Sequence, residues 1–391
     1  MMYEKEVKEK VTAILPQVVT WRRHFHEYPE LSGKEVKTSA YIQDVFKNLG
    51  IPYETGFFQN AVLGIIKGSH PGKTVALRAD MDALPVTELT GLPFASKNEG
   101  VMHACGHDGH MSILLGAAAV LNEMKEQIHG TVKIVFQPAE EEAAIGARHI
   151  AASGKLDDVS EIYGLHVWPE LPTGQVGLKP GALMAASDRF YVHIKGKSTH
   201  AAQPHNGTDA LVAAAHFIID VQSLISREMN PMDNVVCTIG LMNAGTRYNV
   251  GVEDAYLEGT CRTYRPELRD KMEARLGEIL KGLDVMFHTH SELNYVRGHS
   301  ATINTPEKID FLKKVGKAYL GEEHITEPEF PSMCAEDFSS YLEKFPGAFF
   351  WLGTGDGNTP ALHNASFAIN ESILPLGITL EAAAALEALS R

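Results

Sequence analysis

Cysteine and long apolar runs are both scarce in this chain of 391 residues. The four cysteines, Cys105, Cys237, Cys261 and Cys334, lie far apart in the sequence, which excludes a dense disulfide framework and favours a reducing compartment. No uncharged apolar stretch approaches the roughly 18 residues of a membrane-spanning helix, and the N-terminus lacks the apolar core of a signal peptide. The sequence therefore predicts a cytoplasmic protein without a membrane segment.

Basic residues are fewer than acidic ones. The chain has 35 Lys and Arg and 49 Asp and Glu, which gives a formal net charge of −14. Such a charge repels polyanions, so neither nucleic acid nor an anionic membrane surface is expected as a partner. There are no repeats or low-complexity tracts. The hydrophobic fraction of 44% is ordinary for a globular protein, and the length exceeds what one core usually organises, so we expect two domains.

The densest group of candidate ligands is the segment 103–110, His-Ala-Cys-Gly-His-Asp-Gly-His. Its ligand-type residues are separated only by Ala and Gly, which let the backbone approach a bound atom closely. Good helix formers follow over 111–121, so we expect a loop that enters a helix. A thiolate with imidazoles suits zinc, and suits manganese or cobalt less well. The alternative is a turn with solvated histidines and a buried cysteine, but the density of ligand types favours a metal site.

Three short apolar runs of strand type also end in candidate ligands. They lead into Asp80 and Asp82, into Glu140, Glu141 and Glu142, and into His166. Residues two apart on a strand share one face, and open α/β sheets form sites at the carboxyl ends of their strands. Three adjacent glutamates repel each other, and a divalent cation would remove that repulsion. A further group, His24, His26 and Glu27, could be a set of ligands, but the interpretation that we favour is a helix end that supports the core.

The pattern of predicted elements changes from about residue 184. Strands at 189–194, 234–241, 255–263 and 285–296, with helices at 209–225 and 266–283, give the order β-α-β-β-α-β of a ferredoxin-like domain. The α/β pattern then returns, with helices at 306–319 and 376–390. We therefore predict an α/β fold in which a domain of residues 1–183 and 298–391 is interrupted by an inserted domain of residues 184–297.

Five motifs, taken together, resemble a known family. They are Arg78-Ala79-Asp80-Met81-Asp82, the segment 103–110, Gln137-Pro138-Ala139-Glu140-Glu141, Gly164-Leu165-His166 and Leu362-His363-Asn364. In this order they are similar to the metal-dependent amidohydrolases of the hippurate hydrolase, N-acyl-amino-acid amidohydrolase and auxin-conjugate hydrolase branch, which is related to the zinc aminoacylases and the carboxypeptidase-G-type exopeptidases. The resemblance covers nearly the whole chain. It implies a catalytic domain with a mixed sheet and a two-metal centre, interrupted by a lid that commonly also makes the dimer contact.

The resemblance also implies roles for individual residues. Two divalent ions per subunit (zinc, manganese or cobalt) would be held by Cys105, His107, Glu141, His166 and His363. These ions would activate a water and polarise the scissile carbonyl, while Glu140 acts as general base and Asp82 lies beside the ligands. The choice of Glu141 rather than Glu140 as the ligand rests on the resemblance, because the sequence alone does not decide it.

The inserted domain carries further candidates by resemblance. His200, in the segment 196–205, is similar to a family histidine that stabilises the oxyanion; the alternatives are a surface-loop histidine at this position and a role for His205. Asn249 and Arg262 lie where the family places residues that meet the substrate carboxylate. The chain departs from the family's glycine run after Glu141 and from its usual sequence at 245–252, which leaves the substrate range open.

The implied activity is metal-dependent hydrolysis of the amide bond of N-acyl or N-aroyl amino acids. A dipeptidase or exopeptidase of the same fold is the first alternative, and a non-catalytic metal-binding protein is the second. The expected partners are a small N-acyl amino acid or dipeptide and further copies of the chain, which would form a homodimer or a higher homo-oligomer through the lid.

Overall fold

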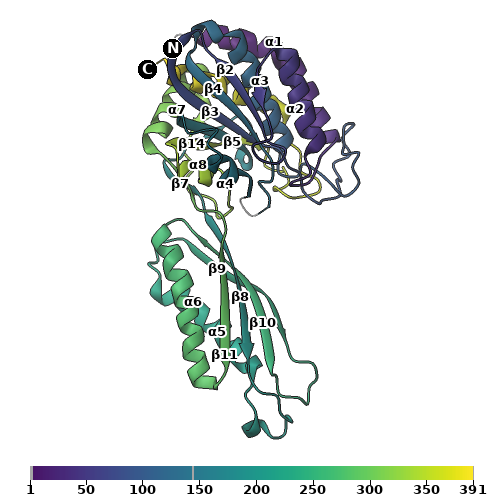
Figure 1. Ribbon diagram of the computed structural model, residues 1–391, viewed down its shortest axis with the longest axis vertical. Helices are drawn as coiled ribbons and strands as arrows, with labels where there is room; N and C mark the ends of the chain where they lie inside the picture. Colours follow the sequence, from purple (N-terminus) through teal and green to yellow (C-terminus); the bar gives the residue numbers. More distant parts are fainter. Residues whose placement is uncertain (1–2, 143–144, 391) are drawn as a thin grey trace. The chain divides into compact units, whose positions relative to one another are not determined.

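The computed structural model describes residues 3–142 and 145–390, which form two compact units (Figure 1). Unit 1 comprises Met1–Leu183, Ile303–Phe330 and Asp337–Arg391, and unit 2 comprises Met184–Thr302 and Pro331–Glu336. The second unit therefore extends beyond residue 297 and also includes the segment from Pro331 to Glu336.

Unit 1 is built around an eight-stranded mixed sheet, which confirms the predicted α/β class. In spatial order its strands are β1 (Tyr53–Glu54), β2 (Val62–Lys67), β4 (His129–Gln137), β3 (His70–Asp80), β5 (Val159–Pro172), β14 (Gly347–Gly355), β6 (Val176–Gly177) and β13 (Ile325–Thr326). Strand β3 runs parallel to β4 and β5, and β14 runs parallel to β5. The carboxyl ends of these central strands therefore lie at the same edge of the sheet.

Seven α-helices belong to the described part of unit 1. They are α1 (Glu4–Glu27), α2 (Val36–Leu49), α3 (His107–Glu123), α4 (Ile145–Ala152), α7 (Pro306–Tyr319), α8 (Ser339–Leu342) and α9 (Leu374–Leu389). Helices α3 and α9 pack against β3, and α1 packs against both of them. Helix α3 is buried from His107 to Leu121, as expected of a core helix that is apolar on nearly all sides. This packing fixes the N-terminus of α3 beside the edge where the central strands end.

Two helical segments, Ala210–Glu228 and Glu371–Leu389, are long and apolar enough to cross a membrane by length and composition alone. The second is mostly buried within unit 1, and core helices pass the same test, so this is weak evidence for a membrane span. Charged residues lie within both segments, so neither is an uncharged apolar run. The absence of a membrane segment stays a prediction.

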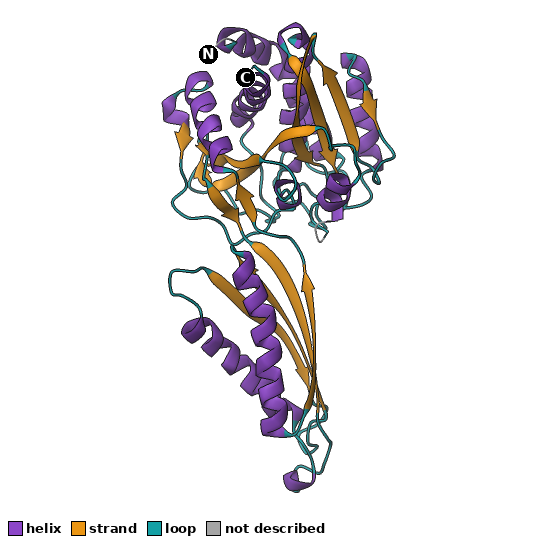
Figure 2. Cartoon of the chain, turned by 60° about the vertical axis from the view of Figure 1, so that its left-hand side comes forward, coloured by secondary structure: helices purple, strands orange, loops and turns teal. Residues whose placement is uncertain are grey.

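Unit 2 has the predicted order of strands and helices. It contains β8 (Ala186–Lys195), α5 (Ala210–Ser223), β9 (Val235–Ala244), β10 (Asp254–Thr263), α6 (Pro266–Phe287) and β11 (His290–Arg297). The strands form an antiparallel sheet in the order β11-β8-β10-β9, with both helices on one side of it (Figure 2). The ferredoxin-like arrangement is thus confirmed. A separate two-stranded sheet contains β7 (Gly181–Met184) and β12 (Thr302–Asn304).

The predicted start of the last strand at residue 285 is wrong. Helix α6 continues through Val285 to Phe287, and His288 ends it in a left-handed conformation with φ of 57°. A short apolar run fits a helix or a strand equally well, so the sequence pattern did not locate this boundary.

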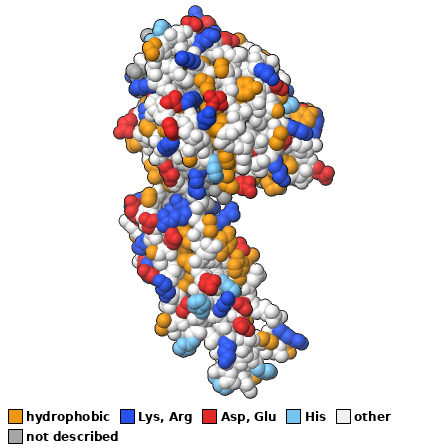
Figure 3. Space-filling view, in the orientation of Figure 1, with side chains coloured by type: hydrophobic (Ala, Val, Ile, Leu, Met, Phe, Trp, Pro, Cys, Tyr) orange, Lys and Arg blue, Asp and Glu red, His pale blue; other side chains and the backbone are white. Residues whose placement is uncertain are grey.

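The surface carries charges of both signs. Acidic and basic side chains are interspersed over the visible face, with no single continuous patch of either sign (Figure 3).

Candidate metal centre and active site

Cys105 and His107 flank Gly106, which has a backbone conformation that favours glycine over every other residue. Gly106 is the N-cap of α3, with φ of 87°, and a Cβ at this position would lie 2.4 Å from Val167 Cγ2. A left-handed backbone and the lack of space both require glycine here. The tight turn delivers the two candidate ligands to the start of the helix.

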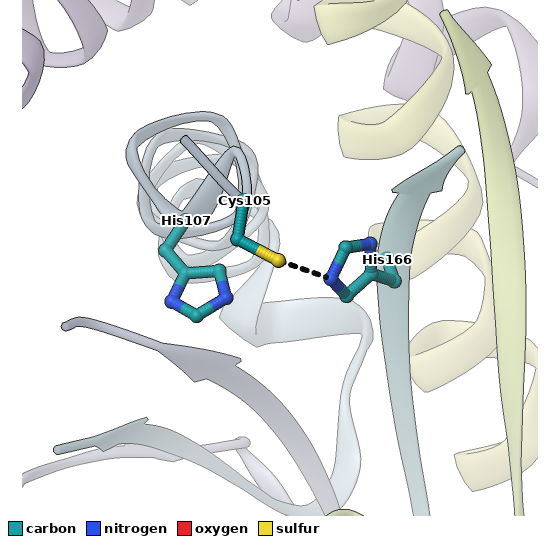
Figure 4. Close-up of side chains that lie close together, drawn as sticks. All are labelled: Cys105, His107 and His166. Atoms are coloured by element: carbon teal, nitrogen blue, oxygen red, sulfur yellow. Dashed lines mark hydrogen bonds between the residues drawn. The ribbon is translucent and has the colours of Figure 1, made fainter. Parts of the chain in front are cut away.

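Cys105, His107 and His166 converge on one small region (Figure 4). Cys105 Sγ lies 3.3 Å from His166 Nε2. The other ring nitrogen of His166, Nδ1, donates to the carbonyl of Val167 at 2.6 Å, which fixes the tautomer and directs Nε2 toward the thiol. His166 lies within β5 rather than at its end, because β5 continues to Pro172 and pairs His166 with Trp351 of β14.

His107 is oriented in the same way. Its Nδ1 donates to the backbone carbonyl of Asp82 at 2.8 Å, while its buried Nε2 has no hydrogen-bond partner among the described residues. Burial opposes a positive charge on this ring, but Asp80, Asp82 and Glu141 outweigh burial and raise the pKa of His107 to about 10. The site therefore attracts positive charge at the position of His107.

Glu140 and Glu141 follow a strained turn at the end of β4. Ala139 has φ of 56°, and the left-handed region costs a residue with a Cβ about 1–2 kcal/mol. Glu140 is buried, and its Oε1 accepts from the backbone N–H of Asp337 at 3.3 Å. The backbone N–H of Glu141 donates to Asp82 Oδ2 at 2.9 Å. Strain of this kind is typical of functional sites, where surrounding contacts maintain it.

His363 approaches the centre from a loop and is the most exposed of the candidate ligands, with 53% of its side chain accessible. Its Nε2 lies 3.3 Å from Glu141 Oε1. The residue has φ of 65°, and its N–H donates to the carbonyl of Ala104 at 2.8 Å. Cys105, Glu141 and His363 can thus present ligand atoms within 4.8 Å of one another, as can His107, Glu140 and Glu141.

The donor set fits a divalent metal centre. A buried thiol, two imidazole Nε2 atoms and a carboxylate are ligands that zinc prefers. Burial, together with the charges of Glu141 and Glu140, raises the pKa of the Cys105 thiol well above its usual range. Without a cation these acidic groups repel one another, whereas a cation would favour the thiolate and pair with the carboxylates.

Buried charged residues surround the candidate ligands. Arg78 bridges two carboxylates, since Nη1 lies 2.8 Å from Asp80 Oδ2 and Nη2 lies 2.6 Å from Asp337 Oδ1. Asp80 Oδ1 in turn accepts from His110 Nδ1 at 2.6 Å. The Nε2 atom of His110 accepts from the N–H of Val167 at 2.9 Å. Both nitrogens of His110 are therefore engaged in support of the site, and His110 is not a candidate ligand.

A second buried cluster lies next to the start of α3. His26 Nδ1 donates to Asp108 Oδ2 at 2.8 Å, and Nε2 donates to Glu88 Oε1 at 3.0 Å. Arg22 Nε lies 2.9 Å from the same Asp108 oxygen. Burial opposes the charge on His26, but Asp108 and Glu88 raise its pKa to about 9. Of the group His24, His26 and Glu27, His26 is thus buried in the core, whereas His24 and Glu27 are only partly buried.

The remaining histidine of the segment 103–110 also lies outside the ligand set. His103 is buried, and neither ring nitrogen has a hydrogen-bond partner among the described residues. Burial lowers the pKa of His103 to about 3. The motif thus contains a ligand-type histidine at 107, a supporting histidine at 110 and a buried histidine at 103.

The other three candidates, His200, Asn249 and Arg262, belong to unit 2. His200 is exposed, and its Nδ1 accepts from the N–H of Ala202 at 3.1 Å. Asn249 Oδ1 is buried without a hydrogen-bond partner among the described atoms. Arg262 is half-buried, and its Nη1 donates to the carbonyl of Cys261 at 3.1 Å. A cavity of about 520 Å³ borders the His200 loop and is lined by residues that include Lys197, Thr199 and Arg247.

Sequence reasoning assigned no role to several residues that support the centre. These are Ser32, Glu35, Arg78, His110 and Asp337. Arg78 and His110 belong to two of the motifs described above. A charged residue within an apolar strand could have indicated a supporting role for Arg78. Ser32 and Glu35 carried no such signal, because their partners lie far away in the sequence.

Comparison with known proteins places similar sequences in one family of hydrolases. The family model for peptidase family M20/M25/M40 matches residues 76–387. The N-acetyl-L-cysteine deacetylase of Bacillus subtilis (strain 168) is 39% identical over 358 residues, covering 92% of this chain and 85% of the relative. Thermostable carboxypeptidase 1 of Saccharolobus solfataricus is 35% identical over 389 residues, covering 98% of each chain.

A solved structure is similar over nearly the whole length. The Bacillus subtilis YXEP protein, a dinuclear metal binding peptidase from the M20 family, has a TM-score of 0.86 and 35% sequence identity, covering 97% of this chain and 99% of that chain. The likeness therefore includes both the α/β unit and the inserted unit.

Proposed function

Because the chain belongs to peptidase family M20/M25/M40, we propose that it hydrolyses the amide bond of N-acyl amino acids at a divalent metal centre. The observation that carries this proposal is the convergence of Cys105, His107 and His166 with the Glu140–Glu141 pair inside unit 1. The deacetylase relative supports a small N-acyl amino acid as substrate. The carboxypeptidase relative supports cleavage of a peptide bond by the same chemistry as the alternative.

Five residues of unit 1 would hold two divalent ions per subunit, with zinc, manganese and cobalt as the candidates. They are Cys105, His107, Glu141, His166 and His363. The bound ions would act as Lewis acids that polarise the scissile carbonyl and increase the acidity of the attacking water.

The other groups of unit 1 move protons and maintain geometry. Glu140 takes a proton from the attacking water and delivers it to the nitrogen of the leaving amine, which yields a carboxylic acid and a free amino acid. The Asp337 N–H, at 3.3 Å from Glu140 Oε1, limits the orientations of this carboxylate. Asp82 orients His107 through its carbonyl and fixes the backbone of Glu141 through its carboxylate. A protein that only bound metal would have no use for a base at position 140.

Unit 2 would provide groups for the substrate. By resemblance, His200 donates to the oxyanion of the tetrahedral intermediate, and Asn249 and Arg262 bind the carboxylate of the substrate. The same unit would join copies of the chain in a homodimer or a higher homo-oligomer. We place the enzyme in the cytoplasm, acting on small molecules and not on nucleic acid or membranes.

A hydrolysis panel on the purified protein tests the proposal. It would contain N-acetyl amino acids, benzoyl-glycine, indole-acetyl amino acids and plain dipeptides, measured after chelation and again after addition of zinc, manganese or cobalt. Cleavage of acyl amino acids that metal restores would support the proposal. Cleavage of dipeptides alone would favour the peptidase alternative, and metal binding without turnover of any compound would reject catalysis.

A further inference from the structure

The segment between α1 and α2 reaches the turn that carries Glu140 and Glu141, although more than 100 residues separate Glu35 from Ala139 along the chain. Its course is fixed by the backbone, because Leu31 pairs with Ala83 in a parallel bridge and the N–H of Ala83 donates to the carbonyl of Glu30 at 2.8 Å. The segment therefore lies alongside the residues that follow β3.

Glu35 contacts the strained residue of that turn directly. Its Oε1 accepts from the backbone N–H of Ala139 at 2.9 Å, and Ala139 has the left-handed φ of 56°. On the opposite side, the carbonyl of Ala139 accepts from the N–H of Gly146 at 3.3 Å. The conformation of the residue that precedes Glu140 is thus held through both of its backbone polar groups.

The carboxyl group of Glu35 is itself immobilised. Glu35 is fully buried, with 0% of its surface accessible. Its Oε1 also accepts from the N–H of Gly33 at 2.8 Å, and its Oε2 accepts from Asn60 Nδ2 at 3.1 Å. A buried acceptor with donors on both oxygens has a single favoured orientation, so it can impose its position on the Ala139 amide.

Ser32 supports the other side of Glu140. Its hydroxyl donates to Asp82 Oδ2 at 2.6 Å, and the same oxygen accepts from the N–H of Glu141 at 2.9 Å. Two side chains of one short segment therefore reach the backbone amides of residues 139 and 141, directly or through Asp82. Glu140 lies between these two fixed points.

We propose that Glu35 is a positioning residue for the reaction, acting as the hydrogen-bond acceptor that holds the left-handed turn at Ala139 and thereby aims the side chains of Glu140 and Glu141. This inference rests on the proposed function of that pair. What the turn requires of residue 35 is an acceptor oxygen, so a neutral side chain that keeps the oxygen serves as well as the carboxylate.

Three variants of the full-length protein separate this role from a general effect on stability. Glu35→Met removes the acceptor at similar length, and Glu35→Gln retains an oxygen for the Ala139 amide while losing the one that accepts from Asn60. Glu30→Met is the matched control, because Glu30 Oε2 accepts from the N–H and the hydroxyl of Thr38 near the start of α2 but is not bonded to Ala139. For each variant we would measure kcat, KM, zinc per chain, and hydrogen exchange of a peptide covering 136–141.

We expect kcat of Glu35→Met to fall about 10- to 100-fold, the usual loss when a group that orients ligands is removed, with little change in KM. Exchange of the Ala139 amide should accelerate in this variant alone. Glu35→Gln and Glu30→Met should stay within about threefold of wild-type kcat, because neither loses the acceptor at Ala139.

Wild-type kcat and exchange in folded Glu35→Met would overturn the inference, as would an equal loss of kcat in Glu30→Met. If Glu35→Met does not fold, Glu35→Asp, one methylene too short to reach the amide, provides the same comparison. A wild-type protein that cleaves no substrate would reject the proposed function, while the exchange measurement would still decide the role of Glu35.

Discussion

The candidate residues of unit 1 and unit 2 differ in how firmly they are held. In unit 1, His107 and His166 are buried and each donates Nδ1 to a backbone carbonyl. In unit 2, His200 is exposed, and its Nδ1 accepts from the N–H of Ala202 within the same loop. The protein itself thus orients His107 and His166, whereas His200 is exposed to solvent. A group that the protein already holds in place costs less free energy to orient toward the transition state than a mobile group does.

The largest effect is expected at Glu140. Glu140→Gln should lower kcat about 10²- to 10⁴-fold, because an amide cannot accept the proton of the attacking water, while the metal content stays at the wild-type level. Kinetics combined with metal analysis checks this. Glu142→Gln is the control, since Glu142 belongs to the same acidic run but is exposed. Retained turnover in Glu140→Gln would remove the general-base assignment.

A smaller loss is expected at His200, in unit 2. If His200 donates to the oxyanion, His200→Ala should lower kcat about 10²- to 10³-fold without a change in metal content or unfolding midpoint. His205→Ala, in the same exposed loop, should stay near wild type. Equal activity of the two variants would show that unit 2 provides no oxyanion donor at position 200.

The buried His26 should make the stability of unit 1 depend on pH. Asp108 and Glu88 raise the folded-state pKa of His26 to about 9, against 6.5 for an unperturbed histidine. The protonated form is stabilised in the folded state, so the contribution is complete below pH 6.5 and is lost as pH rises through about 9. At about 1.4 kcal/mol per pH unit, it amounts to about 3 kcal/mol of the free energy of unfolding.

Urea unfolding at pH 6 and pH 10 checks this value, and His26→Gln should remove the difference that His26 contributes. His24→Gln is the control, because burial lowers the pKa of His24, so any contribution that it makes to stability rises rather than falls between pH 6 and pH 10. An unchanged pH dependence in His26→Gln would contradict the ion-pair account.

The smallest effect is expected at Arg262. Arg262→Lys keeps the positive charge but loses the planar pair of donors, so KM should rise roughly 10-fold with little change in kcat. Arg265→Lys is the control, since Arg265 is an exposed residue at the N-cap of α6 that pairs with Asp233. An unchanged KM in Arg262→Lys would leave carboxylate recognition to other residues.

Much of the fold followed from patterns that are local in the sequence. The apolar runs of β3 and β4 located their carboxyl ends, and the α6–β11 boundary failed because Val285 fits a helix as well as a strand. The supporting residues could not be predicted, because their roles depend on distant partners. Asp337 lies 259 residues after Arg78, and Asp108 lies 82 residues after His26. Only the folded chain brings such pairs together.

Hydrolysis should depend on metal held by the buried cluster around Cys105. The direct measurement is a zinc titration of the chelator-stripped protein, with zinc binding and hydrolysis of an N-acetyl amino acid followed in the same samples. We expect no turnover without metal, full turnover at two equivalents per chain, and loss of both zinc binding and turnover in Cys105→Ala. Turnover that persists without metal, or that Cys105→Ala leaves unchanged, would contradict the account.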